Sequence, residues 1–203
     1  MAINLANNSS LANITALPSS ISGGGMTLIS EQTASSSATI SFTSGIDSTY
    51  DSYVFKFINI HPATDMADFS FNMSTDGGSN YNVAKTTTYF KAQHQGSSGN
   101  YGQIDYITGF DLAQGTGFQR LTEALEADVS SANMSGYLHL FNPSSDTFVK
   151  HFMYTNSEYG NDVFAVNSFV AGYGNTQSPV NSIQFKFDTG NIDNGIIKLY
   201  GVS

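Results

Sequence analysis

The sequence predicts an all-β fold, an antiparallel β-sandwich of jelly-roll type preceded by an extended N-terminal arm. About ten short segments with strand-like apolar patterns follow one another, bounded by Gly, Asn, Asp or Pro, and no helical segments alternate with them. Charged residues make up 11% of the chain, against about 25% in an average soluble domain. Ser, Thr, Asn and Gly replace them, which is typical of a β-rich protein with many turns.

Residues 1–25 differ from the rest of the chain and form the predicted arm. They contain no charged side chain. Ser9 or Ser10 could cap a short helix that Pro18 ends, and the glycines at 23–25 would form a flexible joint. The aliphatic residues that we expect to bind a partner subunit are Ile3, Leu5, Leu11, Ile14, Leu17 and Ile21. A frayed terminus is the alternative that composition leaves open.

The remaining residues, 26–203, are predicted to form one β-sandwich domain. Its first two strands are Met26–Gln32 and Ala38–Thr43, joined by the small polar residues ASSS. The third strand is Tyr50–Ile60. It has large apolar side chains on both faces, which is typical of a central strand covered on both sides.

The alternation of the third strand assigns each of its apolar residues to a face. Those expected on one face are Tyr53, Phe55 and Phe57, and those on the other are Val54, Ile58 and Ile60. We expect Phe55, Phe57 and Ile58 to be almost fully buried, with a second sheet covering one face and the arm or a neighbouring subunit covering the other.

A half-buried strand is predicted at 69–74, where Phe and Met alternate with Ser and Asn. It runs into the turn sequence Asp76–Asn80, which predicts a hairpin with 81–90 as the return strand. Residues 94–117 are rich in Gly, Ser, Asn and Gln and are expected to form an exposed loop region with a strand at 104–110.

Residues 118–129, FQRLTEALEADV, contain helix-forming residues and predict either a short helix or a strand that runs into a loop. Five further strands complete the sandwich. They are expected at Met134–Phe141, Thr147–Tyr154, Phe164–Tyr173, Ser182–Phe187 and Ile196–Val202.

Several sequence segments are similar to a family of virion-associated structural proteins of tailed bacteriophages, especially phages of marine bacteria. These segments are ISFTSGIDSTYDSYVFKFINIHPATD (40–65), STDGGSNYN (74–82), FDLAQGT (110–116), LFNPSSDTFVKHF (140–152) and GNIDNGIIKLYGV (190–202). They consist of strands and turns, so the resemblance implies a location in the virion and assigns no site residues.

The resemblance implies a non-enzymatic virion protein, and the leading interpretation is a capsid decoration or cement protein anchored by its arm. Its partners would be other virion proteins, and we expect a homo-oligomer. The first alternative is a tail-fibre or tail-tip protein that binds host surface glycans. The second is a glycan-active enzyme or a carbohydrate-binding module.

Charge and composition restrict the function further. The formal net charge is −9, and the basic residues are scattered singly, so nucleic-acid binding is not expected. The chain has no cysteine, which excludes disulfides and thiol chemistry. We find no signal peptide or membrane-spanning run, and expect synthesis in the host cytoplasm without membrane insertion.

Motifs for catalysis, cofactors or metals are not found in the sequence, and we expect none of the three. The residues considered as isolated candidates are the histidines His61, His94, His139 and His151, the calcium-type pairs Asp65 with Asp68 and Asp188 with Asp193, and the acidic residues Glu123, Glu126 and Asp128. Strand or turn positions and a solvated acidic patch account for them better.

Tyrosines in or beside the Gly- and Asn-rich loops are the better candidates for contacts. They are Tyr101, Tyr106, Tyr159 and Tyr173. Tyrosine is enriched at protein interfaces, and its ring can also stack on a sugar, so both kinds of partner stay open here.

Overall fold

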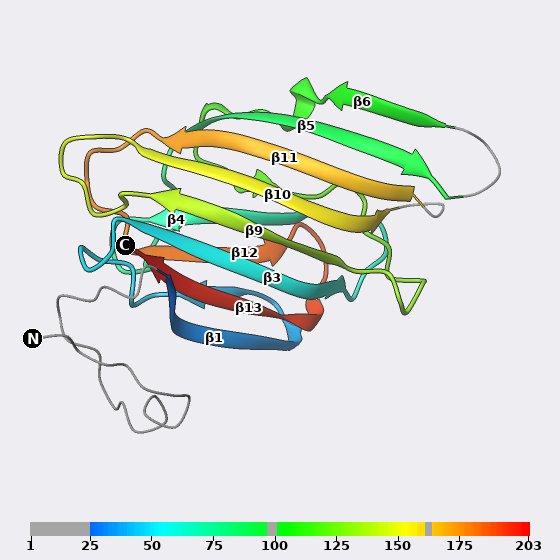
Figure 1. The fold of residues 1–203 in the computed structure, drawn as a ribbon, viewed down its shortest axis with the longest axis horizontal. Coiled ribbons are helices and arrows are strands. Elements are labelled where there is room, and N and C mark those ends of the chain that lie inside the picture. The colour runs from blue at the N-terminus through cyan, green and yellow to red at the C-terminus, as the bar shows by residue number, and fades with distance from the viewer. Residues whose placement is uncertain (1–24, 97–100, 161–163) are drawn as a thin grey trace, which may run out of the picture.

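The computed structural model describes residues 25–96, 101–160 and 164–203. Within these ranges the chain forms two antiparallel sheets that pack face to face (Figure 1). The large sheet has the order β1 (Met26–Ser37), β13 (Ile192–Val202), β3 (Ser52–Pro62), β9 (Met134–Phe141), β10 (Lys150–Gly160), β11 (Phe164–Gly174), β5 (Lys85–Gln95) and β6 (Gly102–Tyr106), with β7 (Ala113–Gly115) also paired to β5.

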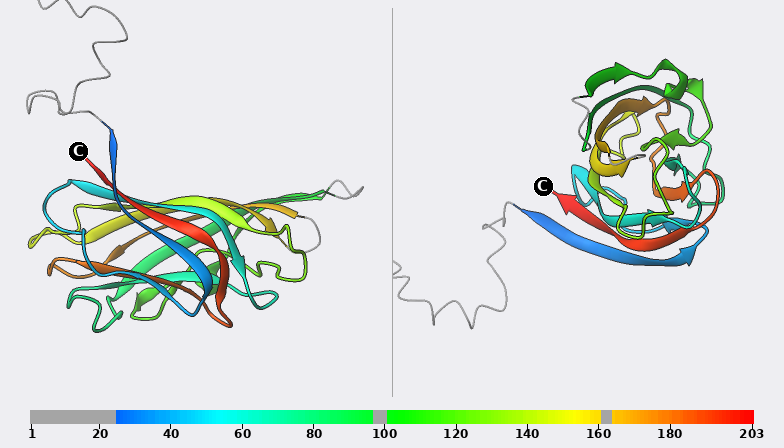
Figure 2. Two further views of the ribbon diagram at one scale, coloured as in Figure 1. Left: turned by 90° about the horizontal axis from the view of Figure 1, so that it is seen from below. Right: turned by 90° about the vertical axis from the view of Figure 1, so that its right-hand side faces the viewer.

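The small sheet has the order β2 (Ile40–Phe42), β12 (Ser182–Phe187), β4 (Phe69–Ser74) and β8 (Gln119–Arg120). The large sheet is curved, and the small sheet lies inside its curve (Figure 2). A single 3₁₀ turn, η1 (Thr108–Phe110), is the helical element of the described ranges. The predicted antiparallel β-sandwich is therefore confirmed, but this strand order does not confirm the jelly-roll connectivity.

Aromatic side chains fill the space between the sheets. Phe55 and Phe57 of β3 are 0% and 1% exposed, as predicted. Their ring centroids lie 5.4 Å and 5.1 Å from that of Phe185, which comes from the middle of the small sheet. The edge-to-face geometry of these pairs adds to the free energy of burying the rings.

The prediction for the end of β3 is wrong. Ile58 is half-buried, and Ile60 lies in the core with Phe57. The cause is a bulge, because Asn59 adopts a φ of 53° and the register with β9 shifts between Phe57 and Ile60. The extra residue returns Ile60 to the inner face. A Cβ on Gly195 of β13 would lie 2.9 Å from the carbonyl oxygen of Asn59, so the bulge needs glycine there.

The prediction of a hairpin between β4 and residues 81–90 is also wrong. Gly77 and Gly78 have positive φ and form the turn, and the Asp76 carboxylate accepts hydrogen bonds from Ser74 and Asn80, which lowers the pKa of Asp76 to about 2. However, both edges of β4 are already paired, with β12 and β8. The chain therefore crosses to the large sheet and enters β5 at Lys85.

Other boundaries shift without changing the fold. β1 continues through the predicted ASSS connection because it stays paired with β13 as far as Ser37. For 118–129 the strand-and-loop alternative is confirmed, since β8 is followed by a loop that pairs at Leu125 with Ala67 and Gly160. Residues 94–117 contain β6, η1 and β7 rather than one strand in a loop. All predicted arm contacts, at residues 1–24, lie outside the described residues.

The core predicts the cost of removing an aromatic ring. Phe57→Ala should lower the free energy of unfolding by about 3–5 kcal/mol, because the ring is fully buried and the cavity cannot close. Chemical denaturation measures this. The matched control is Phe148→Ala at a ring that is 68% exposed, which should cost less than about 1 kcal/mol. Equal losses in the two variants would contradict the packing described here.

Candidate functional site: the outer face of the large sheet

We call the outer face the set of side chains that point away from the small sheet on β3, β9, β10, β11 and β5. The strand registers align them in rows that cross the strands. The central row, extended by β13 and β6, consists of Lys198, Lys56, Tyr137, Thr155, Phe169, Phe90 and Tyr106. At about 4.8 Å per strand it spans roughly 29 Å.

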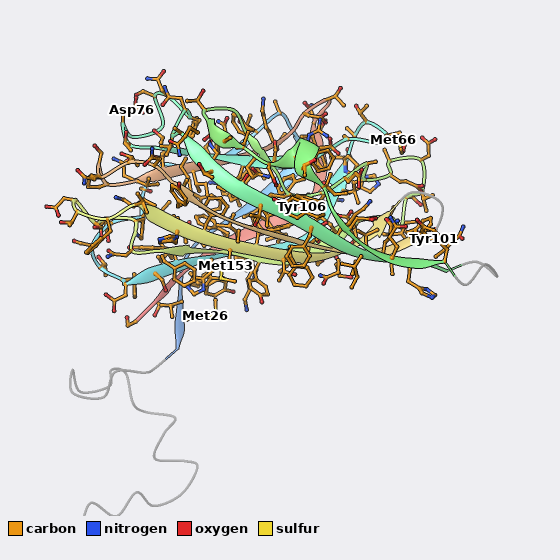
Figure 3. All side chains as sticks on the ribbon, turned by 90° about the horizontal axis from the view of Figure 1, so that it is seen from above. Met26, Met66, Asp76, Tyr101, Tyr106 and Met153 are labelled. Atoms are coloured by element: carbon orange, nitrogen blue, oxygen red, sulfur yellow. The ribbon has the colours of Figure 1, made fainter. Side chains whose placement is uncertain are left out.

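Aromatic and apolar side chains are exposed along this face. Tyr137, Phe90 and Tyr106 are 49%, 41% and 55% exposed. Phe90 stacks on Phe169 with 4.9 Å between ring centroids. Met153, in the adjacent row, is 58% exposed and lies on the side away from the small sheet (Figure 3). Exposed apolar surface of this extent is typical of a binding surface.

The charge of the outer face differs from that of the whole chain. Although the net charge is −9, none of the described outward side chains on these five strands is a carboxylate. Their titratable groups besides tyrosine are Lys56, His61, His94, His139 and His151. The Lys56 amine lies 5.2 Å from the centre of the Tyr200 ring on β13. The five central strands thus present no outward carboxylate, which would admit an anionic partner, and the nearby carboxylates of Asp111 and Asp193 lie at the margins, beside Tyr106 and His61.

A shallow hollow of about 240 Å³ opens between β5 and β11. Ala171 and Gly172 form its floor, and Tyr173, Thr86 and Thr88 line it. The His151 ring is next to it, 6.0 Å from the ring centre of Tyr173. The small residues Ala171 and Gly172 leave this space open, and the tyrosine provides a stacking surface. The Thr86 hydroxyl accepts hydrogen bonds from Gln114, and the Thr88 hydroxyl donates to the Ala171 carbonyl, so each keeps part of its hydrogen-bonding capacity.

The structure places three of the candidate tyrosines on the same face of the large sheet, with Tyr173 and Tyr159 near opposite ends of the β10–β11 pair. Tyr106, Tyr159 and Tyr173 alternate with inward-facing residues and point outward. The Tyr106 hydroxyl donates to Asp111. Tyr101 is separate, since it packs edge-on against Phe164 at the end of the sheet (Figure 3). Sequence reasoning missed Tyr137, Phe90 and Met153, which strand alternation alone could have assigned to an exposed face.

A second polar cluster lies inside the sandwich, where sequence reasoning named no residue. The carboxyl group of Glu158 is buried and accepts a hydrogen bond of 2.6 Å from the Asn156 amide. Its other oxygen, Oε1, has no hydrogen-bond partner among the described residues. Burial raises the pKa of Glu158 to about 8, although the hydrogen bond from Asn156 acts to lower it. Strand alternation could have identified Glu158, because it follows Phe152, Tyr154 and Asn156 at a spacing of two and therefore lies on the same inner face.

Glu123, one of the acidic residues considered from the sequence, lies beside a second cavity of about 270 Å³, separate from the hollow at Tyr173. It forms an ion pair with Lys91, and both residues line this cavity. Its negative charge also disfavours ionisation of the buried Glu158. Glu126 and Asp128 follow in the loop after β8. The cavity therefore has a carboxylate that is already neutralised by a lysine.

The candidate calcium aspartates serve as loop anchors. Asp68 accepts a backbone hydrogen bond from Ala124 and pairs with Arg120 at 2.8 Å, and burial raises its pKa. Asp188 accepts from the Asp68 amide. Asp65 accepts from the backbone of residue 127, and Asp193 is 3.8 Å from His61. Within the described ranges, no group of three or more His, Cys, Asp or Glu could hold a metal ion.

The histidines are strand residues. His61 lies within β3 rather than in the expected turn and is mostly buried. His139 hydrogen-bonds Ser52 at 2.9 Å, and burial lowers the pKa of its imidazole. His94 and His151 are exposed on the outer face.

Comparison with known proteins gives no match: no family model, no curated protein and no solved structure is significantly similar to this chain. Over the described residues, no helix is long and apolar enough to cross a membrane.

The buried carboxyl group predicts a pH dependence of stability. The folded protein keeps the Glu158 proton up to about pH 8, whereas the unfolded chain releases it near 4.5, the ordinary pKa of a glutamate. Stability should therefore fall as the pH rises from about 4.5 to about 8. Glu158→Gln should remove this part of the slope and raise the melting temperature at pH 8.

The control for this experiment is Asp51→Asn, a change at an exposed carboxylate. It should retain the part of the slope of melting temperature between about pH 4.5 and about pH 8 that comes from Glu158. A Glu158→Gln protein with the wild-type slope would show that the carboxyl group is not buried in its neutral form.

Proposed function

We propose that this chain is a non-enzymatic structural protein of a bacteriophage particle, a decoration or cement protein anchored to the capsid by residues 1–25. The observation that carries the proposal is the set of segments similar to phage virion proteins. In the structure these segments form strands and turns of one sandwich, including β3, the turn after β4, the connection from β9 to β10, and β13. A jelly-roll connectivity, common among viral capsid and lectin domains, is part of the proposal.

The arm supplies the attachment in this proposal. It is uncharged and has spaced aliphatic residues, so exposure of these side chains to water is unfavourable. Burying them in a groove of a neighbouring subunit or a sister copy would be favourable. Ordering the backbone is costly, so hydrogen bonds to the partner must contribute, as they do in β-augmentation. The arm joins the sandwich at β1, an edge strand of the large sheet, where it can reach a neighbour.

The first alternative, a tail-fibre or tail-tip protein, shares the arm and differs in location. Copy number per virion distinguishes the two. A value comparable with that of the major capsid protein indicates the head, and a value comparable with that of the baseplate proteins indicates the tail.

The arm proposal predicts a separable attachment function. A protein lacking residues 2–22 should remain soluble and folded, because its β-domain keeps the whole described core, but it should no longer enter particles. The test complements a phage deleted for the gene with the truncated protein and assays purified virions. Incorporation at the normal level would refute the anchoring role and assign the contact to the β-domain.

The non-enzymatic assignment predicts that purified protein shows no hydrolytic turnover of peptidoglycan or polysaccharide. The reason is that Glu123 forms an ion pair with Lys91 and that Glu158 is buried in the interior. Reducing-sugar release over long incubation measures this. Reproducible turnover that Glu123→Gln or Glu158→Gln abolishes, with the fold intact, would establish the enzyme alternative instead.

A further inference from the structure

We infer that the outer face of the large sheet binds an anionic polysaccharide, with one sugar ring in the hollow beside Tyr173. This surface is different from the arm, so the inference stands or falls separately from the attachment proposed above.

The first argument is the chemistry of the hollow. A sugar ring has an apolar face of C–H groups and a rim of hydroxyl groups, so it fits between an aromatic ring and short hydrogen-bonding side chains. Tyr173 supplies the ring, and Thr86 and Thr88 supply the hydroxyls beside Ala171. The Thr86 hydroxyl accepts from Gln114 and keeps its proton to donate, and the Thr88 hydroxyl donates to the Ala171 carbonyl at 3.4 Å and keeps its lone pairs to accept. The volume of about 240 Å³ is below the range of about 300–1,000 Å³ of pockets that enclose drug-sized ligands, so it would hold one unit of a longer chain.

The second argument is the continuation of the site across the strands. From the hollow, the outer face passes over His151 and Met153 on β10 to His139 on β9, which lies opposite Val54 of β3. Lys56 is two residues further along β3, opposite Tyr137 of β9. The side chains beside this path are the imidazoles of His151 and His139, the apolar Met153 and the ring of Tyr137. A linear chain could therefore contact several strands, whereas a compact ligand would use the hollow alone.

The third argument is charge, and it selects an anionic chain. The described outward side chains of these five strands include no carboxylate, while the protein as a whole has a net charge of −9. Lys56 is the permanent cation of the path, and it is free of a carboxylate partner in the described ion pairs. A polysaccharide with uronate or sulfate groups would be repelled by the other surfaces and accepted on this one.

The experiment measures binding of the full chain to polygalacturonate, alginate and chondroitin sulfate, with dextran as the neutral polymer. Affinity electrophoresis or calorimetry is run at about 0.05 M and about 0.5 M salt, since screening weakens surface electrostatics. We expect at least one anionic polymer to bind, dextran to bind more weakly or not at all, and high salt to reduce binding.

Two pairs of variants locate the site. Tyr173→Ala should weaken binding about tenfold, while Tyr101→Ala, at an exposed ring that packs on Phe164 at the other end of the sheet, should have little effect. Lys56→Glu should weaken binding about as much, while Lys186→Glu, which changes the net charge equally but lies on the small sheet, should not. A melting curve for each variant verifies the fold.

Three results would overturn the inference. They are failure to bind any of the anionic polymers, equal binding by the Tyr173 and Lys56 variants and their controls, and equal affinity for dextran. If the polymers fail to bind and the outer-face variants reduce incorporation into particles, the face is a protein interface and the polysaccharide assignment is wrong.

Discussion

The packing of one ring, Phe185, determines how the two sheets fit together. It stands in the middle of the small sheet, and its neighbours from both sheets are Phe42, Phe55, Phe57, Phe69 and Phe71. The small sheet is narrow, so this cluster covers only the middle of the large sheet's inner face. Beyond it, the loop after β8 covers the sheet through buried Leu121 and Leu125.

This unequal coverage explains where polar groups are buried. Glu158 and Asn156 lie on inner positions of β10, outside the aromatic cluster. Two lysines are buried as well, and both are tied to acceptors. Lys85 donates to the Asn72 side chain and to the carbonyl of Val83, and burial lowers its pKa to about 7. Lys150 donates to backbone carbonyls of the loops at 145–148 and 176–177. Such groups remain inside because each has hydrogen bonds.

Alternation and turn residues predicted most of the strands, because burial on one face leaves a period of two in the sequence. Ser182–Phe187 and Met134–Phe141 are found at the predicted bounds. The errors have physical causes that the pattern does not contain. The bulge at Asn59 depends on a glycine in β13, far away in sequence. The false hairpin after β4 depends on which strands already pair with β4. For the candidate site, the sequence named Tyr106, Tyr159 and Tyr173 but not Tyr137, because the shared face depends on the register between strands.

The edges of the large sheet have features that oppose pairing with another chain, whereas its outer face exposes apolar side chains. An open sheet edge invites pairing with another chain. Here β1 has a bulge between Leu28 and Ser30, and its Glu31 pairs with Lys198 of β13, while the opposite edge strand, β6, is short. These features oppose uncontrolled pairing. The outer face, in contrast, keeps Tyr137, Phe90 and Met153 exposed, although polar residues there would improve solubility. A sheet that is protected at its edges and apolar on its face is suited to bind through side chains rather than through its backbone.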